Sequence, residues 1–236
     1  MIETQIVGDV TLEQEETKQD VLQTQYLFAS GVYCIEKPEF LTTAKFVSKQ
    51  YLDEAKKNKP KDKLMDKLFP VVMSGSFGHE LLINPLAMYI ANTGWNILNG
   101  QGYAMDNHEI FMMDFWAQEH HMTSSNEEHV HGFGSQITGF YILEAPEHCS
   151  NITVFDPRAG KKQINLLERD VNQVTQASLV VNYTPKAGNL YLLNSWLPHG
   201  FSRHGSEKPL KFIHFNLGSR FIQPQTPPKT QDINDE

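Results

Sequence analysis

The pattern of hydrophobic and polar positions changes character shortly after residue 100. From Pro38 onward, apolar residues recur at three- and four-residue steps, which is the period of an amphipathic helix. The pattern predicts helices over about residues 38–51 and 79–98, and the glycines Gly100 and Gly102 then act as turn signals. The lysine-rich piece at residues 56–67 is typical of a solvated helix end and loop. Helices that come first and cluster together predict a layer packed on one face of a sheet.

After Gly102 the chain consists of short runs of β-branched and aromatic residues between turn residues, which is typical of strands. These runs cover residues 109–118, 135–144, 151–155, 163–167, 177–183, 189–195, 199–202 and 210–217. An earlier run, residues 25–35, predicts one more strand with a bend at Gly31. Seven or eight short strands at this spacing predict a mainly β fold, a sandwich or barrel.

The length and the order of these segments favour a single domain over residues 1–236. We expect an N-terminal strand and helical layer at 1–104 and a β core at 105–220. The acidic residues 1–22 read as a strand or arm followed by loosely ordered chain. The tail at 221–236 carries three prolines without apolar periodicity, so we expect it to be flexible.

Composition narrows the class of partner. The chain has 20 lysines and arginines against 28 aspartates and glutamates, a formal net charge of −8. This balance argues against a nucleic acid or an anionic membrane as the main partner and favours a small-molecule or protein substrate. Cys34 and Cys149 lack the spacing of a disulfide framework or a zinc knuckle. Without a signal-peptide pattern or an apolar run long enough for a membrane span, we expect a soluble, cytoplasmic protein.

One short motif carries chemistry. His129-Val130-His131 leads through Gly132-Phe133-Gly134 into the apolar run at 137–143. On a strand, residues i and i+2 point to the same face, so the two imidazoles should lie side by side. Two adjacent neutral imidazoles fill a core poorly but form half of a metal site.

A third histidine, His199, follows the segment Asn194–Pro198 and lies 68 residues after His131. That separation leaves room for several intervening strands, so a folded sheet can bring the three histidines together. Three nitrogen ligands suit zinc, iron, copper or nickel, and open coordination positions favour catalysis over a structural role. His214, inside the last strand, reads as a satisfied core histidine.

Several further segments agree with one known family. They are His129–His131, Gln136–Tyr141, Phe155–Arg158, Pro185–Tyr191, Asn194–His199 and Phe212–Asn216. In their order and spacing, the chain resembles the iron(II)- and 2-oxoglutarate-dependent oxygenases, in particular a branch found widely in marine bacteria and their phages. The resemblance covers about residues 109–217 and implies a double-stranded β-helix, the jelly-roll or cupin-like fold.

The resemblance also implies a ligand set. The superfamily holds iron through a histidine, a carboxylate two residues later and a distal histidine, which correspond to His129, His131 and His199. Histidine stands here in place of the carboxylate. Either His131 coordinates as a neutral third ligand, or Asp156 supplies the carboxylate from a neighbouring strand; Asp156 also reads as a turn residue before Pro157.

The cosubstrate 2-oxoglutarate needs a cation for its distal carboxylate. The resemblance points first to Lys211, 12 residues after His199, with Arg158 and Arg203 as competitors. Tyr141 could donate its hydroxyl to the same carboxylate. The structural alternatives are a solvated lysine at a strand end and an ordinary core tyrosine.

The implied activity is that of an Fe(II)- and 2-oxoglutarate-dependent dioxygenase that hydroxylates a substrate the sequence does not specify. Two rivals stay open. One is a three-histidine metalloenzyme that does not use 2-oxoglutarate, either a cupin-type dioxygenase or a zinc hydrolase. The other is a metal-free β-sandwich that binds a ligand through Trp116, Phe133 and Trp196. The sequence leaves a homo-oligomer open as well.

Overall fold

The computed structural model describes residues 23, 25, 27–60 and 62–222. The expected N-terminal arm therefore lies outside the described residues, as does the expected C-terminal tail from residue 223 on; Phe221 is the last residue of the final strand. Contacts divide the chain into two units, Met1–Ser30 and Gly31–Glu236, and all helices and strands below belong to the second. No described helix is long and apolar enough to cross a membrane.

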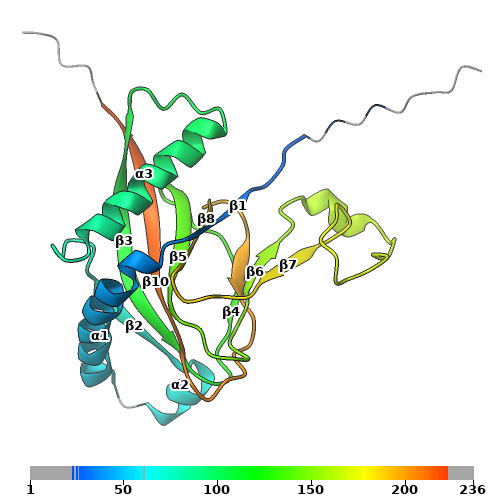
Figure 1. The fold of residues 1–236 in the computed structure, drawn as a ribbon. Coiled ribbons are helices and arrows are strands. Elements are labelled where there is room, and N and C mark those ends of the chain that lie inside the picture. Colours follow the sequence, from blue (N-terminus) through cyan, green and yellow to red (C-terminus); the bar gives the residue numbers. More distant parts are fainter. Residues whose placement is uncertain (1–22, 24, 26, 61, 223–236) are drawn as a thin grey trace, which may run out of the picture. The chain divides into compact units, whose positions relative to one another are not determined.

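The helices precede residue 105, where the apolar three- and four-residue steps predicted them (Figure 1). The 3-10 turn η1 (Pro38–Phe40) leads into α1 (Leu41–Asn58), and α3 (Asn84–Gly100) follows later. The lysine-rich piece, expected as a helix end and loop, contains the end of α1 and also a short helix that was not expected, α2 (Lys63–Leu68). Helices α1 and α3 bury one face each, so tertiary packing stabilises them.

The strands form two antiparallel sheets. The large sheet has the order β1-β8-β5-β10-β3-β2, and the small sheet has the order β4-β9-β6-β7. The members of the large sheet are β1 (Val32–Glu36), β2 (Val71–Ser76), β3 (His108–His120), β5 (Ser135–Glu144), β8 (Asn189–Asn194) and β10 (Leu210–Phe221). Those of the small sheet are β4 (Asn126–His129), β6 (Ile152–Phe155), β7 (Val180–Tyr183) and β9 (His199–Phe201).

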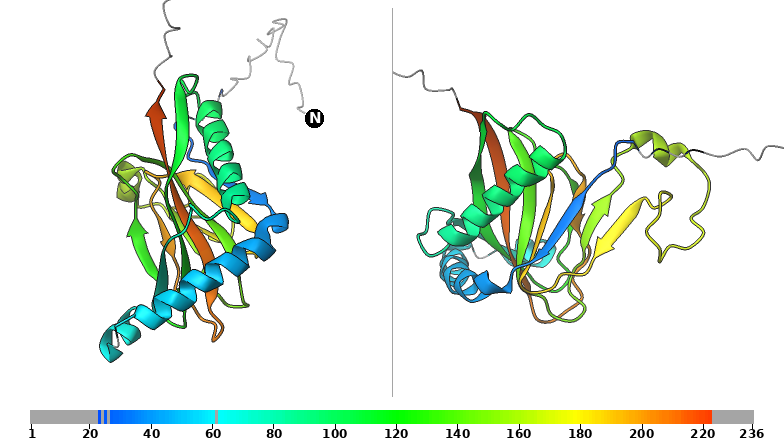
Figure 2. Two further views of the ribbon diagram at one scale, coloured as in Figure 1. Left: turned by 90° about the vertical axis from the view of Figure 1, so that its left-hand side faces the viewer. Right: turned by 45° about the horizontal axis from the view of Figure 1, so that its top comes forward.

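This arrangement is the mainly β, double-stranded β-helix with an N-terminal helical layer that the sequence predicted. Figures 1 and 2 show α1 and α3 against one face of the large sheet, with the small sheet on the other side. Two predictions were wrong. Residues 163–167 form no strand, since the 3-10 turn η2 (Ala159–Gln163) ends there, and β2 arises where no strand was expected.

Two hydrophobic clusters occupy the two sides of the large sheet. The first joins α1 and α3 to the sheet and includes Val47, Ile90, Ile213 and Phe215. The second lies between the sheets and includes Phe140, Phe201 and Phe212. Because β10 contributes to both clusters, its two faces are buried and its sequence is apolar almost throughout.

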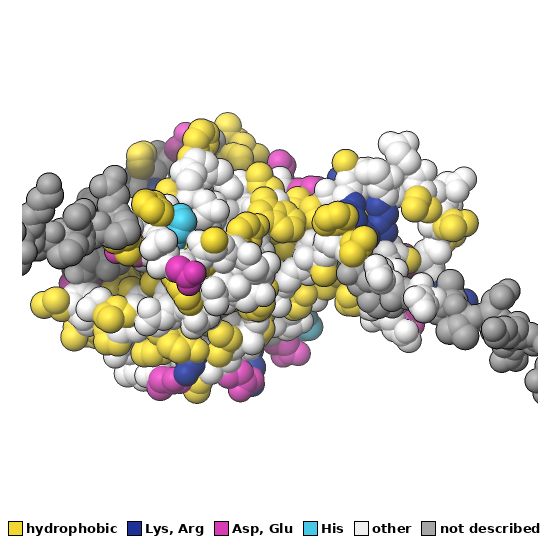
Figure 3. All heavy atoms as spheres, turned by 90° about the horizontal axis from the view of Figure 1, so that it is seen from above, with side chains coloured by type: hydrophobic (Ala, Val, Ile, Leu, Met, Phe, Trp, Pro, Cys, Tyr) yellow, Lys and Arg dark blue, Asp and Glu magenta, His cyan; other side chains and the backbone are white. Residues whose placement is uncertain are grey.

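The outer surface is mixed in character. Figure 3 shows hydrophobic side chains spread among polar atoms on the face seen from above, where lysine and arginine occupy only small areas.

Gly139 shows how tightly the central strands pack. A Cβ atom added there would lie 2.2 Å from the carbonyl oxygen of Tyr191 and 2.4 Å from the Phe215 ring. The backbone of β8 and a buried ring cannot both move away, so only glycine fits between them.

We predict that Gly139→Ala lowers the free energy of unfolding by about 2 kcal/mol or more, since overpacked cores commonly lose about 1–3 kcal/mol. Chemical denaturation measures this change. Gly100→Ala is the control, because nothing lies within 4 Å of its added Cβ. Equal stabilities for the two variants would contradict the packing described here.

Candidate metal centre

The three histidines predicted as a group meet at one end of the small sheet. His129 is the last residue of β4, and it lies opposite His199, the first residue of β9, in the β4–β9 ladder. His131 lies two residues beyond the end of β4, in a loop rather than on the strand that the sequence suggested. Its backbone N–H donates to the Ser195 carbonyl at 2.9 Å, which ties this loop to the turn before β9.

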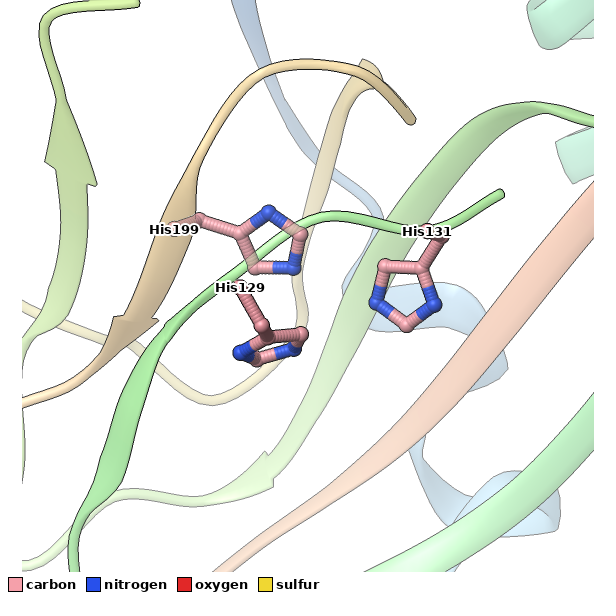
Figure 4. A group of neighbouring side chains, drawn as sticks. All are labelled: His129, His131 and His199. Atoms are coloured by element: carbon pink, nitrogen blue, oxygen red, sulfur yellow. The ribbon is translucent and has the colours of Figure 1, made fainter.

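The three rings face one another (Figure 4). Their centroids are 4.6 Å apart for His129 and His199 and 5.2 Å apart for each of the other two pairs. One nitrogen from each ring lies within 4.8 Å of the others. Among the described residues this is the group of histidine, cysteine or carboxylate side chains arranged to hold a metal ion.

The backbone fixes which ring nitrogens face the common point. His129 Nδ1 lies 2.8 Å from the Glu127 carbonyl oxygen, and His199 Nδ1 lies 2.9 Å from the Leu197 carbonyl oxygen. Because a carbonyl only accepts, each Nδ1 carries the proton and each Nε2 keeps a free lone pair. Metal-bound histidines are held in this way by groups behind them.

Burial leaves two ring nitrogens of this group without a partner. His131 Nε2 and His199 Nε2 are buried and have no hydrogen-bond partner. A buried polar atom without a partner costs free energy, so the pair indicates that a ligand completes the site. The donor set therefore fits a transition-metal ion such as iron(II).

Electrostatics agree with this fit. Burial, assisted by the neighbouring imidazoles, lowers the pKa of His131 and of His199 to about 4 each. The rings are therefore neutral at pH 7, which is the form that binds metal.

Asp156 does not join this group. Its side chain accepts from Arg158 and lies 2.9 Å from Lys161 Nζ, and it is 6% exposed. The two cations hold the pKa of Asp156 well below its usual range, Arg158 contributing most. Its oxygens are bound by these cations, and Asp156 lies outside the group of residues arranged to hold a metal ion. The candidate donor set consists of the imidazoles of His129, His131 and His199.

The residues predicted to bind the cosubstrate carboxylate lie elsewhere. Lys211 precedes Phe212, which packs between the sheets, and so points to the α1 side of β10. There its Nζ lies 3.1 Å from Glu144 and 4.0 Å from the buried Glu119, which also binds Lys56 of α1. Lys211 thus belongs to an ion cluster that attaches α1 to the sheet.

Tyr141 and Arg158 are also directed away from the histidines. The Tyr141 hydroxyl donates to the Lys37 carbonyl at 2.6 Å, and the ring lies in the cluster under the helices. Arg158 is half exposed and makes a two-pronged contact with Asp156. In this structure the side chains of Tyr141, Arg158 and Lys211 thus have partners away from the three histidines, and their role as cosubstrate ligands stays a prediction.

The sequence interpretation missed polar groups on β10 near the three histidines. His214 was taken for a satisfied core histidine, yet its Nδ1 is buried without a partner and its ring lies 5.0 Å from that of His131. Trp116 packs on the other side at 4.1 Å. Asn216, two residues further along β10, has a buried Oδ1 that also lacks a partner. Two polar residues at i and i+2 in an otherwise apolar strand are the signal that could have revealed them.

The fold and the site define a metal-dependent double-stranded β-helix protein. The model of a family described as "Putative 2OG-Fe(II) oxygenase" matches residues 114–216, the span that contains all three histidines. This part of the chain is thus similar to the iron(II)- and 2-oxoglutarate-dependent oxygenases, in agreement with the sequence resemblance.

Solved structures share the fold. AviO1 from Streptomyces viridochromogenes Tue57 is 11% identical, with a TM-score of 0.55 and coverage of 84% of this chain and 92% of that one. A prolyl-4-hydroxylase from Pseudomonas putida is 12% identical, with a TM-score of 0.52 and coverage of 81% and 94%. The epimerase SnoN, solved with Fe3+, alpha ketoglutarate and nogalamycin RO, is 10% identical, with a TM-score of 0.53 and coverage of 86% and 88%. No curated protein matches the chain in sequence.

We predict that the stability of the metal-free protein falls as the pH drops from about 6.5 to about 4. In this window the unfolded chain takes up protons on His131 and His199 that the folded chain does not, because burial lowers both pKa values to about 4. Stability is thus highest above pH 6.5. Denaturant unfolding at a series of pH values measures the slope.

His199→Gln should flatten that slope, because one of the buried titrating groups is gone. His79→Gln is the control, since its side chain is 73% exposed, and should leave the slope as in the wild type. A slope that is the same in the His199→Gln variant would contradict the assignment.

Proposed function

We propose that this protein is an Fe(II)- and 2-oxoglutarate-dependent dioxygenase that holds iron through His129, His131 and His199 and hydroxylates its substrate. The observation that carries the ligand assignment is the convergence of three imidazole nitrogens, two of them buried without a partner. When bound together, iron and 2-oxoglutarate supply the activation of dioxygen and the oxidation of a C–H bond.

The protein's own residues contribute orientation and exclusion of water. The Glu127 and Leu197 carbonyls hold two of the rings with Nε2 inward, as described above. Phe140, which is 1% exposed and 5.7 Å from the His199 ring, packs against the site from β5. Such apolar walls keep solvent from an oxidising centre and strengthen the polar contacts within it.

For the substrate, we propose only a chemical class. Structural neighbours include prolyl hydroxylases, one of them in complex with a hypoxia inducible factor peptide fragment, and the epimerase in complex with nogalamycin RO. A small molecule or a protein side chain is therefore the class we propose, with neither a nucleic acid nor a membrane as partner. The free cysteines Cys34 and Cys149 support a location in the cytoplasm, and a homo-oligomer stays open.

One observation favours a second candidate function. The donor set contains no carboxylate, and the three residues expected to bind 2-oxoglutarate lie outside the site. A three-histidine metalloenzyme that does not use 2-oxoglutarate, either a cupin-type dioxygenase or a zinc hydrolase, would need neither feature. Zinc in the native protein, together with no spectral response to iron(II) and 2-oxoglutarate, would support this candidate.

We predict that His199→Ala weakens Fe(II) binding by more than about 100-fold, because even the groups behind a ligand contribute about 10- to 100-fold. Under oxygen-free conditions, iron content and the weak visible absorption band of iron(II) with 2-oxoglutarate measure the loss. His148→Ala is the control, as its side chain is 79% exposed and outside the group. Wild-type iron content in the His199→Ala variant would remove His199 from the site.

We predict that Lys211→Met leaves the dissociation constant of 2-oxoglutarate unchanged, because Lys211 pairs with Glu144 and Glu119 on the α1 side of the sheet. Titration of the iron(II)-loaded protein, followed by the same absorption band, measures it. Lys208→Met, at an exposed position before β10, controls for a general loss of positive charge. A tenfold weaker 2-oxoglutarate complex in Lys211→Met alone would return Lys211 to the cosubstrate site.

A further inference from the structure

Asn216 on β10 has an acceptor that no described group satisfies. The side chain is 6% exposed, and its Nδ2 donates to Asp114 Oδ2 at 3.2 Å. The reversed amide would set two oxygens against each other, so Asp114 fixes the orientation of the amide. Asn216 Oδ1 is left buried, without a partner and able only to accept.

Asp114 and Asn216 form the facing pair two residues along the β3–β10 ladder from Trp116 and His214. In the β3–β10 ladder, Trp116 is opposite His214 and Asp114 is opposite Asn216. Residues two apart share a face and are separated by about 6.8 Å along a strand. Since the His214 ring contacts the His131 ring, Asn216 points into the same space a short distance further out. The Asp114 carboxylate acts in the direction that raises the pKa of His131, against the stronger effect of burial.

The charges of the pair indicate the chemistry of a ligand. Asp114 is exposed, and in the described part of the chain no lysine or arginine forms an ion pair with it. Along β3, the charged residue Glu109 is already paired with Arg220. The pair therefore presents a carboxylate and an amide oxygen, both acceptors, and offers no positive charge. Two acceptors with a negative charge repel a carboxylate such as that of 2-oxoglutarate. They attract a positively charged group that donates hydrogen bonds.

We propose that Asp114 and Asn216 form a substrate subsite that binds a primary ammonium or guanidinium group. The inference rests on the proposed function only for the fate of the substrate, because binding of the cation needs no iron chemistry. The charged nitrogen would be held two residues along β10 from His214, whose ring contacts that of His131, so the oxidised carbon would lie several bonds away from it. An amine- or guanidine-bearing small molecule and a lysine or arginine side chain meet this description alike.

The test uses the full-length protein loaded with cobalt(II), with n-butylammonium and n-butylguanidinium as probes. 1-Butanol serves as the uncharged probe with the same alkyl chain. Dissociation constants come from titrations followed by ligand NMR, and paramagnetic broadening reports how near each probe lies to the metal. We expect both cations to bind at least about tenfold more tightly than 1-butanol, as hydrogen bonds to a charged group allow. The cation with the lower dissociation constant indicates whether the subsite prefers an ammonium or a guanidinium group.

Asp114→Asn keeps the shape and hydrogen bond of the pair but removes its charge, and should weaken both cations about tenfold without affecting 1-butanol. Asn216→Leu should weaken them as well, and its thermal unfolding shows whether it folds. Glu109→Gln, which removes a charge from the same strand, should bind all three probes as the wild type does. Equal binding of cations and 1-butanol, or cation binding that Asp114→Asn leaves unchanged, would overturn the subsite.

A failure of the proposed function can be distinguished from a failure of the cation subsite by two separate measurements. Protein that takes up no cobalt(II) at the three histidines would refute the metal assignment, and saturation-transfer NMR on the metal-free protein would still measure the cation binding. Cation binding there that Asp114→Asn abolishes supports the subsite, whereas its absence overturns it.

Discussion

The feature on which the site depends is the burial of imidazole nitrogens whose lone pairs find no partner in the protein. An apolar sandwich ordinarily excludes such atoms, since an unsatisfied buried acceptor costs about 1–3 kcal/mol. Here two of them belong to the histidine group, on His131 and His199, and a third unpartnered atom is on His214, whose ring lies 5.0 Å from that of His131. Their concentration in one place is difficult to explain as a packing accident and follows directly if ligands complete the site.

The same feature explains why the fold is built as it is. The backbone carbonyls that hold His129 and His199 come from β4 and from the turn before β9, so the backbone of the strand and of the turn orients the rings. The large sheet supports this region from behind, with β10 packed on both faces. Precision at the metal ligands therefore comes from regular structure, and the loop with His131 is fixed by its hydrogen bond to Ser195.

Much of the fold could be predicted from the sequence, and the reasons for the failures are physical. The helical periodicity of α1 and α3 and the apolar runs of β3, β5, β8 and β10 are strong local signals. The run at 163–167 is apolar as well, but its residues are exposed and have no partner strand, so composition alone misled. Strand β4, with the sequence NEEH, carries no apolar pattern at all and forms because β9 pairs with it.

Some residues of the candidate site could be predicted from the sequence and others could not. The three histidines could be predicted because a two-residue step and a distant partner leave a visible pattern. The side of the sheet on which Lys211 and Tyr141 lie could not be read, because β5 and β10 are covered on both faces and show no polar alternation. The lining role of His214 and Asn216 depends on which groups remain unpaired after folding, and this is a property of the packed structure.

The pairing of β4 with β9 has a consequence of its own. β4 is a four-residue edge strand, and its ladder with β9 has a register shift between Asn126 and His129. A metal ion shared by His129 and His199 would act as a cross-link at the end of this weak ladder. Amide hydrogens of β4 should then exchange with solvent more slowly in the metal-loaded protein than in the metal-free one. Metal binding would thus determine how often β4 separates from β9 and becomes accessible to proteases.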